Sequence, residues 1–450
     1  MKALRERLIA EGVHTLLVQF TDMHGVAKGK LVPLAHLDDV LAVGAGFSGP
    51  SIAGTGLPRT GPRAEYMARG AASTACALPW LPGVARIVGD GFVAGEAFDA
   101  CPRQILKRAV ARLADQRCSL HVGIEPEFFL LKAVDRACVP ADDADRLAKP
   151  SYDLKSLARQ MPFLRDLHDA LERCKLDVLQ LDHEDAHGQY EVNFAFTDAL
   201  ATADNLLLFK LAAHAIAERH GMLFSMMPKP FADQPGSGMH CHVSLWEGHG
   251  DNARNLFLPH SADGALDTGR PLSALGRQFV AGVLAHADAL TALAAPTVNS
   301  YKRLTVGESL SGTTWAPAYV AQGPNNRTAL VRTLPGRFEW RAPDASANPY
   351  LMLAGLVAAG LDGIERQLDP GPDCEEDLFE LSLAQIAERG IALLPQSLAE
   401  AIDALEADAT VCGALGATMT REFIAAKRDE HQAYVRHVSD WELQRYMSAF

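Results

Sequence analysis

Alternating polar and apolar positions mark four segments of the chain as half-buried strands. In residues 121–131, Glu125 and Glu127 are two positions apart, so both side chains lie on one face of a strand while apolar side chains occupy the other. The same alternation recurs in three further segments, residues 188–196, 237–246 and 337–341. If the four strands share a sheet, one face is apolar and packed, and the opposite face lines a polar cavity.

Helical periodicity begins after about residue 100, and the last part of the chain is mostly helical. This periodicity predicts helices over residues 104–113, 203–220, 349–367 and 398–406. The first hundred residues instead hold strand-like runs at 15–20 and 85–88, and the Gly- and Pro-rich stretch 44–62 is predicted as an extended loop. Strands and helices alternate irregularly, which favours an α+β fold over a doubly wound one. The change of pattern near Cys101 predicts two domains, 1–100 and 101–450.

The predicted polar face carries an unusual set of side chains. It comprises Glu125, Glu127, Gln189, Glu191, Asn193, His240, His242, Ser244, Arg337, Glu339 and Arg341. Carboxylates that face one another are costly unless cations neutralise them. Oxygen-rich sites with imidazole suit Mg²⁺ or Mn²⁺ better than structural zinc, and arginine beside a divalent cation is suited to holding a phosphoryl group. A single such strand is also explained by an ordinary solvated sheet face, but four strands with the same arrangement favour a site.

Composition narrows the choice of partners. The chain has 450 residues and a formal net charge of −13, which argues against nucleic acid or an anionic membrane as its main partner. We find no run of about 18 apolar residues and no signal-peptide pattern, so we expect no transmembrane span. The eight cysteines show no Cys-x-x-Cys spacing. We therefore expect a reduced, cytoplasmic protein.

Seven motifs in the chain resemble those of the glutamine synthetase family. They are Gly123-Ile-Glu-Pro-Glu-Phe-Phe, Asp182-His-Glu-Asp-Ala-His-Gly-Gln-Tyr-Glu, Met227-Pro-Lys-Pro-Phe, Gly236-Ser-Gly-Met-His-Cys-His-Val-Ser-Leu, Pro296-Thr-Val-Asn-Ser-Tyr-Lys-Arg-Leu, Asn325-Asn-Arg and Glu339-Trp-Arg-Ala-Pro-Asp. The resemblance covers nearly the whole chain. It implies a small N-terminal β-grasp domain, followed by a catalytic domain with an antiparallel half-barrel surrounded by helices.

The resemblance also implies the chemistry and the assembly. Members of the family use ATP and two or three Mg²⁺ or Mn²⁺ ions to phosphorylate the γ-carboxylate of L-glutamate, and an amine then attacks the acyl phosphate. They are homo-oligomers of stacked rings with active sites between subunits, so a dodecamer is expected here.

Motif positions assign roles to individual residues by resemblance. One cation would be held by Glu127, Glu184 and Glu191, and another by Glu125, His240 and Glu339. Phosphate and nucleotide binding would involve His242, Ser244, Trp246, Arg327, Arg332 and Arg337. Glutamate would be held by Gly236, Arg303 and Arg341, and the amine pocket would include Tyr152, Glu184 and Trp315. Arg327, Glu184, Arg303 and Trp315 are the residues we expect to act in catalysis.

Two departures from the family pattern concern the amine. The loop that in ammonia-using members carries an acidic residue reads Gly44-Ala-Gly-Phe-Ser-Gly-Pro-Ser-Ile here, and the glutamate that precedes Ala-Pro in the flap is replaced by Trp315. Both changes remove a carboxylate and leave apolar surface, which suits a methyl group. The chain resembles most the family members that use methylamine, so we expect methylamine as the amine, with ammonia or another small amine as the alternative.

Structural explanations for some of these residues, and other functions for the chain, stay open. Trp315 is also explained by packing of the flap, and Tyr152 by a solvent-facing loop position. An inactive paralogue and a phosphotransferase are further alternatives, although the complete set of predicted cation ligands argues against the former. Phe379 occupies the position of a modifiable tyrosine in some bacterial members, so we expect no adenylylation there. His183, His187, His214 and His249 are interpreted as surface or packing residues.

Overall fold

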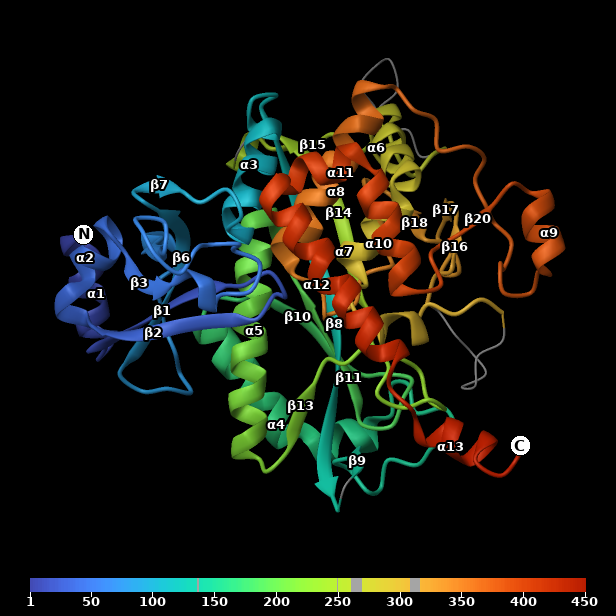
Figure 1. The fold of residues 1–450 in the computed structure, drawn as a ribbon, viewed down its shortest axis with the longest axis horizontal. Coiled ribbons are helices and arrows are strands. Elements are labelled where there is room, and N and C mark those ends of the chain that lie inside the picture. Colours follow the sequence, from blue (N-terminus) through green and yellow to red (C-terminus); the bar gives the residue numbers. More distant parts are fainter. Residues whose placement is uncertain (136, 249, 260–268, 308–315) are drawn as a thin grey trace.

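The computed structural model describes residues 1–135, 137–248, 250–259, 269–307 and 316–450. Within these residues two sheets account for most strands, and helices cover the larger sheet (Figure 1). The α+β fold expected from the sequence is confirmed. Trp315 lies outside the described residues, as does His249.

The N-terminal sheet comprises the seven strands described before residue 100. They are β1 (Thr15–Thr21), β2 (Ala27–Pro33), β3 (Ala45–Ser48), β4 (Glu65–Gly70), β5 (Cys76–Ala77), β6 (Val84–Val93) and β7 (Glu96–Ala97). Helices α1 (Lys2–Ala10) and α2 (Leu37–Ala42) belong to the same region. β1 runs antiparallel to β2 and parallel to β6. β3 lies inside the stretch predicted as a loop, because its pairing with β4 is a tertiary contact that its Gly-rich sequence does not encode.

The larger sheet is built around β8, which pairs with strands on both sides. Its strands within the described chain are β8 (Cys118–Val134), β9 (Ala137–Pro140), β10 (Val178–His183), β11 (Gln189–Phe194), β12 (Thr197–Asp198), β13 (Leu223–Ser225), β14 (Met239–Glu247), β15 (Arg254–Asn255), β17 (Gln322–Pro324), β18 (Val331–Leu334) and β19 (Arg337–Trp340). The main path runs β10-β11-β8-β14-β19-β18-β17. All four strands with predicted polar stripes are therefore in one sheet. The pairing is antiparallel except between β17 and β18, which are parallel.

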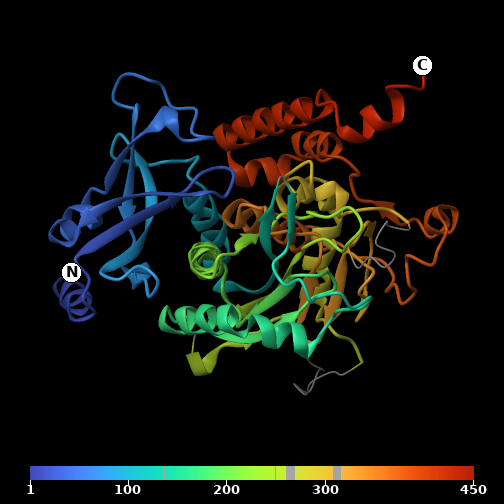
Figure 2. The same cartoon turned by 90° about the horizontal axis from the view of Figure 1, so that it is seen from below.

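Helices and one small strand pair complete the described chain. The helices are α3 (Pro102–Ala114), α4 (Leu154–Arg173), α5 (Ala199–Arg219), α6 (Ala274–Ala285), α7 (Ala287–Ala294), α8 (Pro349–Glu365), α9 (Leu383–Glu388), α10 (Leu398–Ala407), α11 (Ala409–Leu415), α12 (Ala417–Val435) and α13 (Asp440–Tyr446). β16 (Tyr319–Val320) pairs with β20 (Ala392–Leu393). Figure 2 shows α4 and α12 on opposite sides of the molecule. α5 has the length and apolar composition of a membrane span, but much of it is buried within the protein.

A buried ion-pair network ties the N-terminal sheet to the helices. Arg103, the second residue of α3, donates to both carboxylate oxygens of Asp204 at 3.0 and 2.9 Å and to Asp90 of β6 at 2.5 Å. Asp204 on α5 also accepts from the Tyr350 hydroxyl at 2.6 Å. The last strand of the N-terminal sheet, β7, ends at Ala97, and α3 begins at Pro102. This change from sheet to helix supports the proposed domain boundary between residues 100 and 101, and the ion pairs connect the two proposed domains.

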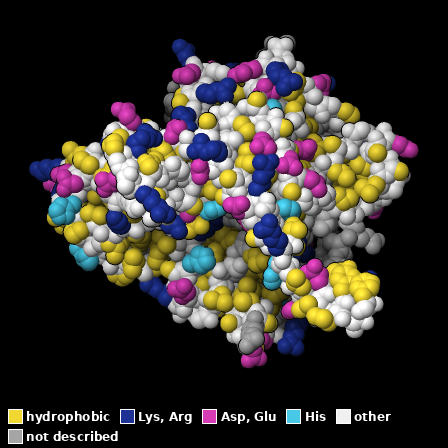
Figure 3. All heavy atoms as spheres, in the orientation of Figure 1, with side chains coloured by type: hydrophobic (Ala, Val, Ile, Leu, Met, Phe, Trp, Pro, Cys, Tyr) yellow, Lys and Arg dark blue, Asp and Glu magenta, His cyan; other side chains and the backbone are white. Residues whose placement is uncertain are grey.

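The C-terminal end carries exposed apolar side chains. Around α13, which extends from the body of the molecule (Figure 3), the exposed large apolar residues are Val438, Trp441, Leu443, Tyr446, Met447 and Phe450. Such a patch is unusual on the surface of an isolated soluble chain and is typical of an interaction surface.

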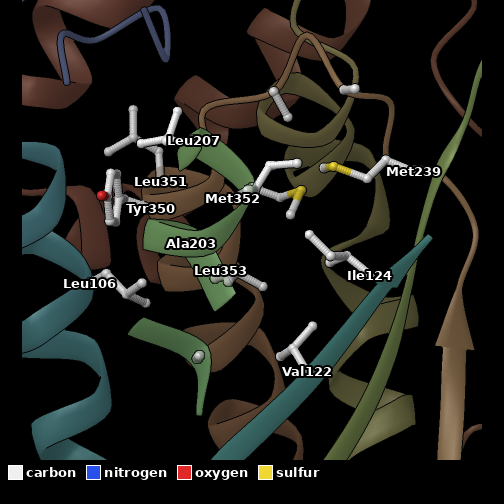
Figure 4. Packing of buried hydrophobic residues seen from close by; sticks show 14 of the residues in the cluster. Leu106, Val122, Ile124, Ala203, Leu207, Met239, Tyr350, Leu351, Met352 and Leu353 are labelled. Atoms are coloured by element: carbon white, nitrogen blue, oxygen red, sulfur yellow. The ribbon is translucent and has the colours of Figure 1, made fainter. Parts of the chain in front are cut away.

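The apolar face of the larger sheet packs against helices. Figure 4 shows Val122 and Ile124 of β8 directed toward α5 and α8, where Leu353 is among the buried partners. Since successive strand residues alternate between faces, Glu125 and Glu127 of the same strand point to the opposite side. Burial of one face therefore sets the direction of the carboxylates on the other.

Helices α6 and α8 approach each other at glycines. A Cβ atom built on Gly282 would lie 2.0 Å from the carbonyl oxygen of Ala359, and one on Gly363 would lie 2.2 Å from that of Gln278. Backbone is in contact with backbone here, so a flexible side chain is not available to move aside.

We expect Gly282→Ala to destabilise the fold by about 1–3 kcal/mol or more, because the helices must separate. Gly413→Ala is the matched control, since no described atom lies within 4 Å of its added Cβ and it lies inside α11. That change should be neutral or should stabilise by up to about 1 kcal/mol. Urea denaturation at a fixed protein concentration measures both, and equal effects of the two substitutions would contradict the close approach.

Candidate active site

A cavity of about 920 Å³ lies on the polar face of the larger sheet. Strand register brings the predicted residues together, since Glu125 lies opposite His240 and Glu339 lies opposite His242. The predicted site residues that line the cavity are Glu125, Glu127, Tyr152, Glu184, Glu191, Gly236, His240, His242, Ser244, Trp246, Arg303, Arg327, Arg332, Arg337, Glu339 and Arg341. Every predicted site residue that the structure describes is therefore at this cavity.

Three glutamates form one group of possible cation ligands. One carboxylate oxygen from each of Glu127, Glu184 and Glu191 lies within 4.8 Å of the others. Glu127 is held in place by the Gly238 amide at 2.9 Å and by the Gln189 side-chain amide at 3.0 Å. Gln189 is on the predicted polar face, and its contact with Glu127 gives it a supporting role that the sequence does not reveal.

Burial and mutual repulsion disfavour the charged forms of these glutamates. Burial raises the pKa of Glu127 to about 7, although Arg303 and the Gly238 amide act in the opposite direction. Burial together with the charge of Glu127 raises the pKa of Glu184 well above its usual value. Burial and Glu184 do the same to the pKa of Glu191. The group therefore binds protons near neutral pH unless a cation replaces them.

A second group comprises Glu125, His242 and Glu339, whose ligand atoms also lie within 4.8 Å of one another. The sequence had assigned His240 rather than His242 to this cation. Both imidazoles are available, because the two histidines are two positions apart on one face of β14: His242 Nε2 lies 3.1 Å from Glu125, and His240 Nδ1 lies 3.2 Å from Glu339. Burial and nearby Arg341 hold the pKa of His240 well below its usual value, so this ring is neutral, as a metal ligand must be.

Glu339 differs from the other glutamates because arginines surround it. Burial alone would raise its pKa, but Arg341, with His242 and Arg332, outweighs burial and lowers the pKa to about 2. Arg332 donates to one carboxylate oxygen at 2.9 Å, and Arg341 donates to the other. This end of the cavity is therefore ionised without any added cation.

The motif Asn325-Asn-Arg327 positions two of the cavity's arginines. Asn326 is buried and holds its loop by donating to the carbonyls of Cys374 and Glu376, each at 2.9 Å, which leaves Arg327 exposed at the cavity. Asn325 accepts from Arg332 Nε at 2.9 Å. The two asparagines thus act as supports that motif matching alone does not distinguish from contact residues.

Gly236 lies where a larger residue does not fit. A Cβ atom on Gly236 would be 2.4 Å from the carbonyl oxygen of Pro228. The same oxygen accepts a hydrogen bond from the Ser237 amide at 2.8 Å. Arg303 is buried beside Gly236 and donates to the carbonyls of Ala342 at 2.9 Å and Arg341 at 3.1 Å. These contacts orient the Arg303 guanidinium at the cavity wall.

A fully buried pair, His183 and Asp145, supports the Tyr152 side of the cavity. His183 Nδ1 lies 2.8 Å from the Glu184 carbonyl and Nε2 lies 2.8 Å from Asp145 Oδ2, so both ring nitrogens face acceptors and the ring is an imidazolium. Burial would lower the pKa of His183, but hydrogen bonding to Asp145 raises it. The His183 carbonyl accepts from the Tyr152 amide at 2.9 Å.

His183 is predicted from the sequence only as a surface or packing residue, because no sequence signal connects it with Asp145. The contact depends on how β10 and the segment before α4 meet in the fold. Tyr152 is 69% exposed and lines the cavity, which agrees with a solvent-facing loop position, and its role at the amine pocket stays a prediction.

Aromatic rings line the end of the cavity near Trp246. The Trp246 ring stacks on Phe196, with centroids 5.8 Å apart and an angle of 18° between planes, and its Nε1 donates to Ser244 at 2.9 Å. Phe194 also lines the cavity, although the alternation had placed it on the packed face. β11 ends at Phe194, and the register with β10 shifts near there, so the two-residue period no longer applies.

The cavity offers carboxylate and imidazole ligands for two cations. Its arginines are suited to binding phosphate, and its stacked aromatic rings are suited to packing against a nucleobase. The glutamine synthetase catalytic-domain family matches residues 99–446 of the chain. A glutamate–methylamine ligase of Methyloversatilis universalis is 46% identical over 97% of both chains. A glutamine synthetase of Rhizobium leguminosarum is 38% identical over 96% of both chains.

Solved structures agree with these sequence relatives. A GmaS–ADP complex superposes with a TM-score of 0.90 at 38% identity, and GmaS without ligand with a TM-score of 0.88 at 37% identity, each over the full length of both chains. With the motifs, the cavity and the match over residues 99–446 in agreement, this chain belongs to the glutamine synthetase family.

Proposed function

We propose that this protein joins methylamine to the γ-carboxylate of L-glutamate, converting ATP to ADP and phosphate and giving γ-glutamylmethylamide. The observation that carries the proposal is 46% identity, over 97% of both chains, to a protein named glutamate–methylamine ligase. The alternative is a glutamine synthetase that uses ammonia, which the more distant relatives favour.

Glutamate and phosphate would be held by the arginines of the cavity. Arg303 lies beside Gly236 and Arg341 lines the same cavity, where both would bind the glutamate carboxylates. Arg327, displayed by the loop that Asn326 anchors, would meet the transferred phosphoryl group as its charge develops. Arg332 and Arg337, with Ser244 and Trp246, would bind the nucleotide, whose base fits against the stacked rings of Phe196 and Trp246.

The two groups of carboxylates and histidines fit divalent cations. Buried glutamates with raised pKa values are the expected donor set for Mg²⁺ or Mn²⁺, and a bound cation would supply charge neutralisation for the phosphoryl group. Glu127, Glu184 and Glu191 would hold one cation, and Glu125 and Glu339 would hold the other with His240 or His242. Protein residues would then exclude water, since water hydrolyses an acyl phosphate.

The proposed amine pocket lacks the two carboxylates that ammonia-using members of the family carry in the loop matching residues 44–52 and in the flap. Glu184 would accept a proton from the incoming amine, while Tyr152 and Trp315 would surround its methyl group. Burying one methyl contributes about 0.8 kcal/mol, and a shaped pocket discriminates by roughly 1–3 kcal/mol, which corresponds to a tenfold preference or more. The proposed role of Trp315 rests on the sequence alone.

A homo-oligomer of stacked rings, with a dodecamer as the expected size, would complete this pocket. The described residues that line the cavity all lie between Gly123 and Arg341, so the acid-free loop 44–52 would reach a cavity only from a neighbouring copy. The apolar patch around α13 would be covered in the same assembly. We further propose that the protein acts in the cytoplasm on small molecules.

We expect cation binding to stabilise the protein more strongly as pH rises from about 5 to 8. The folded-state pKa of Glu127 is raised from 4.5 to about 7, so without a cation its effect on stability is most favourable below pH 4.5 and is lost as pH rises through 7. Cation binding requires ionised carboxylates, so a bound cation offsets the stability that is lost when Glu127 ionises. A hundredfold excess over Kd stabilises by about 2.7 kcal/mol.

Thermal unfolding with Mn²⁺ and with EDTA across this pH range measures the effect. Glu191→Gln should reduce the Mn²⁺-dependent rise in Tm, whereas Glu247→Gln, a control at the outer end of β14, should leave it unchanged. A cation effect that is constant with pH would show that the glutamates are already ionised in the cation-free protein.

We expect phosphate release from ATP, in the presence of glutamate and Mg²⁺, to be at least about tenfold faster with methylamine than with ammonium at equal free-amine concentration, because the apolar pocket favours a methyl group. Putrescine should be a poor substrate, since no described carboxylate is assigned to its distal ammonium. Faster release with ammonium would make the protein a glutamine synthetase with an altered flap.

The Trp315→Glu variant should shift the preference toward ammonium, because it restores the carboxylate found at this position in ammonia-using members. We expect the ratio of kcat/KM for methylamine to that for ammonium to fall by about tenfold, the scale of one methyl contact. Thr314→Glu is the control, since it adds the same charge one residue away. An equal fall in both variants would show that the effect comes from charge in general.

A further inference from the structure

Two cysteines that are far apart in the sequence meet outside the proposed active site. Cys76 lies in β5 of the N-terminal sheet, and Cys174 follows the last residue of α4. Both thiols approach one acceptor, the carbonyl oxygen of Ala77, at 3.4 Å from Cys76 Sγ and 3.7 Å from Cys174 Sγ. The two thiols therefore lie on either side of one carbonyl oxygen, close enough for each to shift the pKa of the other.

The pair lines a second cavity, of about 1030 Å³, between the N-terminal sheet, the end of α4 and the first half of α5. Cys76 is partly exposed there, whereas Cys174 is buried. A small molecule that enters the cavity would therefore reach Cys76 first, with Cys174 behind it.

Arginines surround the pair. Arg7 is fixed beside it by donating to the Ala75 carbonyl at 3.0 Å, Arg86 is the strand partner of Cys76 in the register of β5 with β6, and Arg173 precedes Cys174. The interaction with Cys174 lowers the pKa of Cys76, with help from Arg86 and Arg7, although burial opposes the change. The pKa of Cys174 is raised, first by its interaction with Cys76 and then by burial.

This environment divides two roles between the thiols. A partly exposed thiol among cations is the nucleophile in thiol–disulfide exchange, because the thiolate is the reactive form. The buried neighbour keeps its proton until the mixed disulfide has formed, so it does not compete for the oxidant, and it resolves the mixed disulfide once that proton is lost.

We propose that Cys76 and Cys174 form a reversible disulfide, with a small acidic disulfide such as oxidised glutathione as the oxidant. The Cys76 thiolate attacks one sulfur of the oxidant, whose S–S bond breaks and releases one thiolate. Cys174 then loses its proton and attacks the Cys76 sulfur, which releases the second thiolate. Two protein thiols and one small disulfide thus give one protein disulfide and two small thiols.

The bond would join the N-terminal sheet to the end of α4. The other end of α4 begins at Leu154, close to Tyr152 at the proposed amine pocket. The modification thus connects the two proposed domains covalently through a helix that reaches the active-site cavity. This inference does not depend on the proposed function, since it concerns residues outside the cavity of about 920 Å³.

The test is a redox titration of the full-length protein with mixtures of oxidised and reduced glutathione, followed by alkylation of free thiols, digestion and mass spectrometry. We expect a peptide that joins Cys76 to Cys174, with the other six cysteines alkylated, and we expect dithiothreitol to reverse it. The joined protein should also have a higher Tm than the reduced protein, since a cross-link that fits the native fold restricts the unfolded chain.

Single variants separate the two roles. In Cys174→Ser, Cys76 should retain glutathione as a stable mixed disulfide, whereas in Cys76→Ser the buried Cys174 should remain free. Cys138→Ser is the control, because Cys138 is more exposed than either thiol and its loss should not affect the link.

Two results would overturn the proposal. Glutathione on Cys138, with no peptide joining Cys76 to Cys174, would show that exposure alone governs reactivity. A joined protein with a Tm below that of the reduced protein would show that the bond forms only after the native contact is broken.

Discussion

Repulsion among buried carboxylates is the constraint on which the rest of this structure depends. Five glutamates from four parts of the larger sheet line one cavity. They are Glu125 and Glu127 of β8, Glu184 after β10, Glu191 of β11 and Glu339 of β19. A buried carboxylate without a partner is among the most costly groups in a fold. Protons, arginines or divalent cations must therefore offset the charge. Burial favours protonation of Glu127, arginines bind Glu339, and two groups of side chains could hold cations.

The compensation differs between the two ends of the cavity. Around Glu339, Arg332 and Arg341 hold the pKa at about 2, so this end carries its charge permanently. Around Glu127, burial raises the pKa to about 7, so this end exchanges protons in the physiological range. A cation that entered would replace protons at one end and would add to an existing ion-pair network at the other, so its binding would depend on pH.

Supports behind the cavity account for its geometry as much as its lining does. Asn326 holds the loop of Arg327, Asn325 orients Arg332, and the imidazolium of His183 lies between Asp145 and the backbone of Glu184. These contacts use side chains that do not reach the cavity centre. They explain why an active site of this kind requires much of a large domain to build it.

The sequence by itself determined the α+β class and the strands with polar stripes, because a period of two assigns each side chain to a face once one face is apolar. Site residues outside those strands, such as Glu184, Arg303 and Arg327, were identified by the resemblance of their motifs. The period of two failed at Phe194, where the strand ends, and the Gly-rich composition concealed β3, whose pairing with β4 is a long-range contact. Only the tertiary structure brought His183 to Asp145, placed His242 with Glu125 and Glu339, and brought the thiols of Cys76 and Cys174 to one carbonyl oxygen, that of Ala77. Such contacts connect elements whose separation along the chain carries no local signal, so they depend on how the elements pack.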